Sequence, residues 1–117
     1  TPLALHFGES TIILPFSFEE ARNLGKSIQA LIKTFAEKQE AERPKRWDMM
    51  EYRYKSEGAD DAVSLFEVFC NPNAHSSAFD AKLLVTVQAP GGLKMTTEGR
   101  LSNVKADLAG YLQQHKP

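Results

Sequence analysis

Two short runs of apolar residues open the chain, and Gly8 and Glu9 separate them. Residues 3–7 alternate between apolar and polar, and residues 11–16 are almost entirely apolar. Alternation is typical of a half-buried strand, and a two-residue loop with glycine first is typical of a type II′ hairpin turn. We therefore predict a hairpin that gathers its large apolar residues on one face. Its expected pairs are Phe7 with Ser10, Leu5 with Ile12 and Leu3 with Leu14.

From residue 17 the apolar spacing changes to three and four, which is the helical period. Ser17, followed by Glu20, forms a capping box. Pro44 disfavours helical backbone at the residue before it, so we predict a helix that ends near Arg43. Gly25 lies on the apolar stripe, where we expect close approach to a sheet. The other members of the stripe are Ala21, Leu24, Ile28, Leu31, Ile32 and Phe35.

Four further strands are predicted by alternation or by short apolar runs, at residues 47–54, 62–70, 82–88 and 93–101. The last two form a hairpin around Pro90, Gly91 and Gly92, because this three-residue loop places odd-numbered apolar residues opposite one another. A phosphate-binding loop is the alternative for these glycines. It requires the spacing G-x-x-x-x-G-K-[ST] before a helix, and that spacing is absent.

A second amphipathic helix follows, with Ser102 or Asn103 as its expected cap. Its apolar face comprises Val104, Leu108, Tyr111 and Leu112. The order β-β-α-β-β-β-β-α predicts a single α+β domain over residues 1–117. We expect one curved antiparallel sheet with both helices packed on one face. This order resembles the helix-grip and TATA-binding-protein-like folds, an analogy of topology that implies no function.

Composition narrows the possible partners. The formal net charge is −1, so no overall field attracts nucleic acid or an acidic membrane. No apolar run approaches the roughly 20 residues of a membrane span. Cys70 is the one cysteine, which favours a reducing, cytoplasmic setting. No signal peptide is visible, but the chain does not begin with Met, so an upstream targeting segment stays open.

Candidate catalytic and metal-binding groups do not form a recognised pattern. The three histidines, His6, His75 and His115, lack metal-ligand spacing. Cys70 and His75 are a conceivable nucleophile pair, but an unpaired cysteine at the end of an apolar strand is more often buried. The acidic residues of 57–61 lack the Ca²⁺-loop pattern and are read as a solvated turn. We therefore predict no catalytic site, no metal site and no cofactor.

The polar face of the predicted sheet is the first candidate site, because apolar Leu84 lies there among polar neighbours. We predict a non-enzymatic protein-binding or assembly domain, which binds another protein or a second copy of the chain as a homo-oligomer. The predicted interaction face comprises Trp47, Arg53, Lys82, Leu84, Thr86, Lys94, Thr96 and Arg100.

Two alternatives stay open. The first is a small-ligand carrier, since a helix packed on a curved sheet can leave an apolar pocket. Its expected lining is Phe7, Ile13, Phe35, Tyr52, Tyr54 and Tyr111. The second is single-stranded nucleic-acid binding, in which Trp47 stacks on bases and basic residues contact phosphates. The basic residues are Arg53, Lys82, Lys94 and Arg100. Binders of single strands usually carry several aromatic residues on adjacent strands, and the last hairpin has none on its outer face, so this class is the weaker alternative.

One family resemblance covers residues 64–112. The segments "CNPN", "KLLVTV" and "TTEGRLS", with the closing helix, are similar to small uncharacterised proteins of cyanobacteria and plastids. The resemblance implies a cytosolic or stromal setting in a photosynthetic cell. It carries no functional residue over to this chain.

Overall fold

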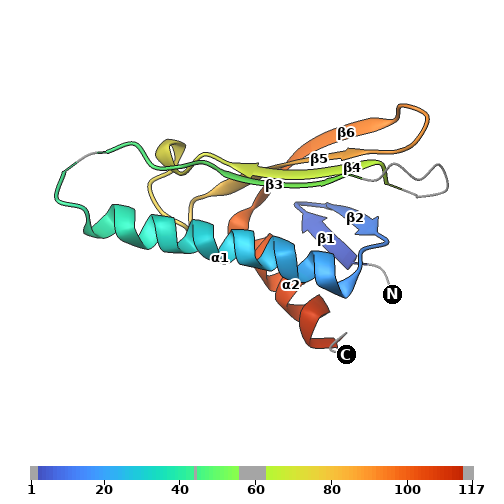
Figure 1. Cartoon of the computed structure of the whole chain (residues 1–117), viewed down its shortest axis with the longest axis horizontal. Coiled ribbons are helices and arrows are strands. Elements are labelled where there is room, and N and C mark those ends of the chain that lie inside the picture. The colour runs from blue at the N-terminus through green and yellow to red at the C-terminus, as the bar shows by residue number, and fades with distance from the viewer. Residues whose placement is uncertain (1–2, 44, 56–62, 115–117) are drawn as a thin grey trace.

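The computed structural model describes residues 3–43, 45–55 and 63–114. Both helices and the first hairpin lie on one side of a four-stranded antiparallel sheet (Figure 1). The α+β class and the predicted element order are confirmed. The elements are β1 (Leu3–Phe7), β2 (Ser10–Leu14), α1 (Phe18–Glu40), β3 (Met50–Lys55), β4 (Leu65–Cys70), the short 3₁₀ helix η1 (Pro72–Ala74), β5 (Lys82–Gln88), β6 (Lys94–Arg100) and α2 (Leu101–Gln114).

Helix α1 begins as the capping box predicts. The Ser17 hydroxyl oxygen accepts a hydrogen bond from the Glu20 backbone N–H at 3.1 Å, which satisfies one of the free donors of the first turn. The helix ends at Glu40 rather than near Arg43, because Ala41 already has extended backbone angles. Phe35 is the last fully buried residue of α1, so its final turn lacks the packing that stabilises a helix.

Strands β3 to β6 form a meander in sequential order, and both predicted hairpin registers are confirmed. In the last hairpin, the Ala89 N–H donates to the Leu93 carbonyl at 2.7 Å, which closes the predicted three-residue loop. Gly91 and Gly92 both have positive φ, a conformation that glycine adopts without a steric penalty. Val87 therefore faces Met95, and Thr86 faces Thr96.

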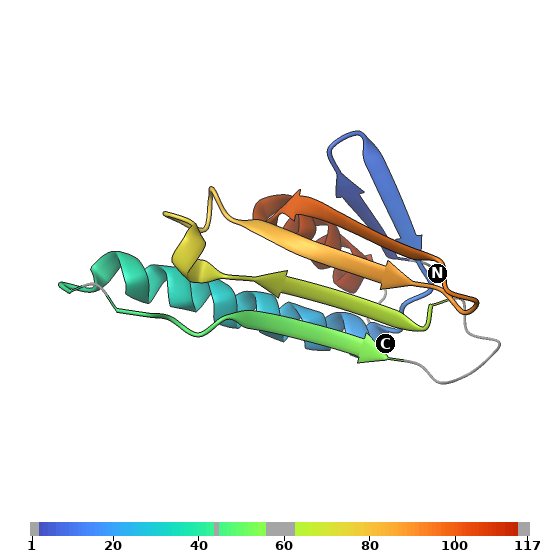
Figure 2. The ribbon, with the colours of Figure 1, turned by 90° about the horizontal axis from the view of Figure 1, so that it is seen from above.

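Strands β1 and β2 pair with each other and with none of the other described strands, so the strands divide into a two-stranded and a four-stranded sheet. The sequence predicted one curved sheet. The difference arises at Gly99, where an added Cβ would lie 2.1 Å from the Phe7 ring. The ring thus occupies the inner surface of β6. The hairpin consequently lies on the helix side of the sheet (Figure 1) and projects past β6 instead of pairing with it (Figure 2).

Helix α2 starts at Leu101, directly after β6, and not at a Ser102 or Asn103 cap. The Leu101 N–H donates to the Ala81 carbonyl at 3.0 Å, so the residue before β5 supplies an acceptor for the first turn of α2. Gly25 of α1 faces this helix rather than the sheet. A Cβ at Gly25 would make ordinary contacts with Leu108 and Leu112 at 3.6 and 3.7 Å.

The core lies between the four-stranded sheet on one side and the helices and first hairpin on the other. Helix α1 runs beneath β3 and β4, and α2 lies beneath β5 and β6 (Figure 2). The buried core contains no polar or charged residue among those the structure describes. Nothing in this part of the chain covers the opposite surface of the sheet (Figure 1). That surface is therefore the largest regular feature available for contact.

Candidate functional site

The uncovered surface of β3–β6 is called the outer face here. Strand residues alternate between the two sides of a sheet, and the exposed or half-buried positions of each strand identify the outward set. The outward residues are Glu51, Arg53, Lys55, Leu65, Glu67, Phe69, Lys82, Leu84, Thr86, Gln88, Lys94, Thr96, Glu98 and Arg100.

The strand register orders most of these side chains in three rows across the sheet. The acidic row is Glu51, Phe69, Leu84 and Glu98; the middle row is Arg53, Glu67, Thr86 and Thr96; the basic row is Lys55, Leu65, Gln88 and Lys94. The acidic and basic rows each place apolar or uncharged residues at their centre and a charge at both ends. The two rows therefore have the same layout and opposite charge.

The middle row is joined by side-chain contacts. Arg53 Nε lies 3.2 Å from Glu67 Oε1, and Arg53 Nη2 lies 3.3 Å from Glu51 Oε1. The Thr86 and Thr96 hydroxyl oxygens are 3.5 Å apart. Exposed ion pairs of this kind add well under about 1 kcal/mol to stability. Their effect is to fix where charge lies on the face.

An apolar centre interrupts the polar face. Leu84 is 41% exposed, and half-buried Phe69 lies opposite it on β4. Leu65, also half-buried, lies on the same face of β4 beyond Glu67. Single exposed apolar residues are ordinary on protein surfaces, whereas contiguous apolar patches commonly mark contact sites. Here Phe69 and Leu84 adjoin on two neighbouring strands. This patch, framed by charges, is the feature most suited to binding another surface.

The predicted interaction face is largely one surface. Its members on β3, β5 and β6 all point outward. Trp47 does not belong with them, because β3 begins only at Met50. The Asn73 side chain instead holds both backbone groups of Trp47, each at 2.8 Å. The Lys45 ammonium lies 4.1 Å from the centre of the Trp47 ring.

Several important outward residues were missing from the predicted interaction face. Alternation alone marked them as outward or ambiguous, but only the register across all four strands brings them into rows. A residue list chosen strand by strand cannot show that pattern. The missing residues are Glu51, Lys55, Leu65, Glu67, Phe69 and Glu98.

The predicted ligand pocket is filled by its own side chains. Phe7, Phe35, Tyr52 and Tyr111 are almost fully buried, and Tyr54 lies edge-on to Phe16 at 5.8 Å between ring centres. Aromatic rings in this arrangement pack favourably against one another. They belong to the close-packed core instead of lining an open space.

Hydrogen bonds fix two of these tyrosines. The Tyr52 hydroxyl donates to Glu20 Oε2 at 2.6 Å, and burial, followed by this contact, raises the pKa of Tyr52 far above its usual range. The Tyr111 hydroxyl donates to the Phe16 carbonyl oxygen. Both phenols are thus used to join the helices to neighbouring segments.

Ile13 was wrongly assigned to that pocket. Its side chain is 64% exposed, because it pairs with Ala4 on the side of the hairpin that faces away from the core. The predicted register itself requires this placement, since Ile12 and Leu14 take the inward positions. The pocket assignment disregarded that alternation.

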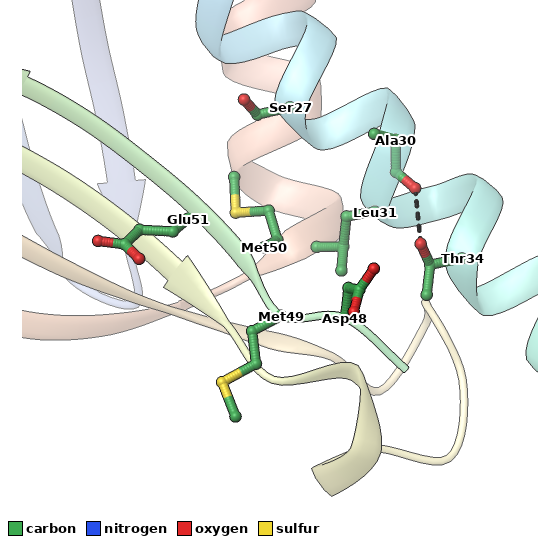
Figure 3. A pocket seen from close by; sticks show the side chains of 8 residues that line it. All are labelled: Ser27, Ala30, Leu31, Thr34, Asp48, Met49, Met50 and Glu51. Carbon is green, nitrogen blue, oxygen red and sulfur yellow. Dashed lines mark hydrogen bonds between the residues drawn. The ribbon is translucent and has the colours of Figure 1, made fainter. Parts of the chain in front are cut away.

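Surface hollows lie elsewhere. One, of about 340 Å³, lies between α1 and the start of β3 and is lined by Ser27, Ala30, Leu31, Thr34, Asp48, Met49, Met50 and Glu51 (Figure 3). Met50 extends to the helix side of the strand, whereas Met49 points away from the helices (Figure 3). The Thr34 hydroxyl donates to the Ala30 carbonyl at 3.0 Å. None of the predicted ligand-pocket residues lines this hollow.

The candidate nucleophile Cys70 is buried. Burial raises the pKa of its thiol from the ordinary value of 9.0 to about 11, so the thiol stays protonated at neutral pH and is a poor nucleophile. His6 Nδ1 lies 3.1 Å from Asp107 Oδ2, a contact that joins β1 to α2. The acidic segment 57–61 and His115 lie outside the described residues.

Within the ranges 3–43, 45–55 and 63–114, no group of His, Cys, Asp and Glu residues is arranged to hold a metal ion. No helix in the same ranges is long and apolar enough to cross a membrane. Comparisons with protein-family models, curated proteins and solved structures found no match to this chain. The resemblance over residues 64–112 therefore stays a prediction.

Proposed function

We propose that this domain is a non-enzymatic protein-binding or assembly module that contacts its partner through the outer face. The observation that carries the proposal is the apolar pair of Phe69 and Leu84, with Leu65 beyond Glu67 on β4, on a sheet surface that no other described element covers (Figure 1). Adjoining apolar side chains framed by charged residues have the composition of a protein contact surface. A cytoplasmic location fits a single unpaired cysteine.

The carrier alternative has less support. It requires a cavity lined by the aromatic residues, and those side chains pack into the core. The nucleic-acid alternative requires stacking aromatics beside a basic groove. On the outer face the basic residues alternate with Glu51, Glu67 and Glu98, and Trp47 lies outside the sheet.

A capture experiment with matched variants tests the proposal. The protein is immobilised as wild type, as Leu84→Lys and as Phe79→Lys, and each is exposed to extract of its source cells. In Leu84→Lys the new ammonium group lies opposite Glu98 on the neighbouring strand, so folding tolerates the added charge while the apolar centre is lost. Phe79 is 74% exposed away from the four strands and serves as the control.

We expect wild type and Phe79→Lys to retain the same specific proteins and Leu84→Lys to lose them. Thermal unfolding of all three proteins, monitored by circular dichroism, establishes that folding is intact. Equal recovery by wild type and both variants, or no specific recovery by wild type, would contradict binding through the outer face. Recovery of a second copy of the chain counts as specific.

A further inference from the structure

We propose that the partner is a second copy of this chain, stacked outer face to outer face about a two-fold axis. The axis runs across the four strands at the middle row. This inference rests on the proposed protein-binding function and names its partner. The observation behind this inference is that the acidic and basic rows have the same layout and opposite charge.

The symmetry operation determines which residues meet. Rotation about an axis across the strands reverses the strand direction but leaves each strand facing its own copy. The acidic row of one protomer then faces the basic row of its partner, and the reverse holds at the other end. Such an interface is isologous, since one patch complements itself. A closed dimer is the result.

The charged residue at each end of the acidic and basic rows then faces an opposite charge on the partner. On β3, Glu51 faces Lys55 of the partner subunit, and on β6, Glu98 faces Lys94 of the partner subunit, because each pair is separated by one middle-row position. On β4, the same operation places Phe69 on the partner's Leu65. Phe69 is thus buried against the partner's Leu65, and Leu84 against the partner's Gln88, while the flanking charges are paired.

The middle row lies on the axis and meets its own copy. Thr86 faces the partner's Thr86, a small polar contact. Arg53 and Glu67 also meet their own copies, which brings like charges together. Within each protomer the two residues form an ion pair at 3.2 Å, and this pairing offsets the repulsion between the copies. Stacked sheets pack about 10 Å apart, which leaves room for these side chains to interleave.

Other two-fold arrangements of the same faces are less favourable. An axis parallel to the strands would place the acidic row on the acidic row and the basic row on the basic row. Like charges brought together in this way disfavour association. Aligned sheets usually cross at about 30°, which displaces the row ends by only a few ångströms. Lysine and glutamate side chains are long enough to follow that displacement.

The expected affinity is modest. Four strands about 4.8 Å apart and about 20 Å long present a flat area of roughly 400 Å² per protomer. Standard stable interfaces remove about 800 Å² of accessible surface per partner. We therefore expect a concentration-dependent dimer with a micromolar dissociation constant, measurable by sedimentation velocity.

A charge-exchange experiment tests the arrangement. One double variant, Glu51→Lys with Glu98→Lys, makes both rows basic; the other, Lys55→Glu with Lys94→Glu, makes both rows acidic. We expect each variant alone to have a dissociation constant raised at least ten-fold over wild type. An equimolar mixture should form mixed dimers, because each basic row then faces an acidic row. Native mass spectrometry distinguishes mixed from homogeneous dimers.

The control is Lys26→Glu with Lys33→Glu, which changes the same amount of charge on the exposed side of α1 and should leave dimerisation unchanged. A monomeric wild type at several hundred micromolar, or a mixture that forms no mixed dimers, would overturn the inference. Dimers that persist in both double variants would also overturn it and would indicate pairing at a strand edge. The proposed function is contradicted separately, by equal capture with Leu84→Lys and Phe79→Lys.

Discussion

At the scale of single residues, Gly99 determines where the first hairpin lies. The Phe7 ring rests directly on its backbone, 2.1 Å from the position that a Cβ would occupy. We predict that Gly99→Ala lowers the free energy of unfolding by about 2–3 kcal/mol, since overpacking a closed core forces neighbouring groups to move. Urea denaturation measures this change.

Gly25→Ala is the matched control for Gly99→Ala. The added methyl group would meet Leu108 and Leu112 at ordinary contact distances, and alanine favours helix over glycine by roughly 0.5–1 kcal/mol. We expect Gly25→Ala to be neutral or stabilising. A similar loss of stability in both variants would show that the Phe7 contact is not the cause.

The buried thiol of Cys70 predicts a loss of stability at alkaline pH. Its folded pKa of about 11 lies above the ordinary value of 9.0, so the stabilisation is complete below pH 9 and disappears as pH rises toward 11. Between about pH 8 and pH 10, wild type should lose about 1 kcal/mol more than Cys70→Ala, which has no thiol to ionise. Urea titrations at both pH values give the difference. Identical pH dependence of the two proteins would contradict it.

At the scale of elements, the Asn73 side chain rather than a strand neighbour holds the segment before β3. The Asn73 side-chain amide accepts a hydrogen bond from the Trp47 N–H and donates one to the Trp47 carbonyl. It also donates to Asn71 Oδ1 at 2.9 Å. Asn73→Ala should therefore cost about 1–3 kcal/mol, because backbone groups lose their partners. The fluorescence of Trp47, the one tryptophan, should move to longer wavelength.

Asn103→Ala provides the control for Asn73→Ala. Asn103 is exposed on α2, and surface substitutions of this kind usually change stability by less than about 0.5 kcal/mol. Its tryptophan emission should match wild type. An unchanged emission maximum in Asn73→Ala would mean that the segment before β3 is held by other contacts.

The elements that could be predicted from the sequence are those whose signal is local. The register of the β5–β6 hairpin follows from odd-numbered apolar residues and the glycine loop, and the start of α1 follows from Ser17 and Glu20. The placement of β1–β2 could not be predicted, because it depends on Phe7 meeting Gly99 across most of the chain. The three rows likewise appear only when the registers of all three strand pairs are known together.

At the scale of the whole molecule, the described sheet, helices and first hairpin leave the outer face uncovered (Figure 1). Both helices pack on the same side (Figure 1), and the core contains the aromatic residues that a ligand pocket would need. The fold thus leaves Leu84 exposed beside half-buried Phe69 on the outer face, while most of the other exposed apolar side chains lie on loops and on the first hairpin. This asymmetry predicts that association, rather than an internal cavity, is where the molecule gains further stability.

The mass of the purified protein distinguishes these two outcomes. In native mass spectrometry we expect a species of twice the 13.0 kDa chain mass without a non-protein increment. A retained increment would favour the carrier alternative.

Salt should weaken the dimer, because the proposed contacts pair Glu51 with Lys55 and Glu98 with Lys94 at the exposed ends of the rows. Raising ionic strength from about 0.1 M to 1 M shortens the screening length from about 10 Å to 3 Å. The dissociation constant from sedimentation should rise several-fold over this range. A variant with all four residues changed to glutamine should bind more weakly than wild type at low salt and respond little to added salt. Tighter association of wild type at high salt would indicate that apolar contact alone drives pairing, and the opposed rows would then have no role in orienting the two copies.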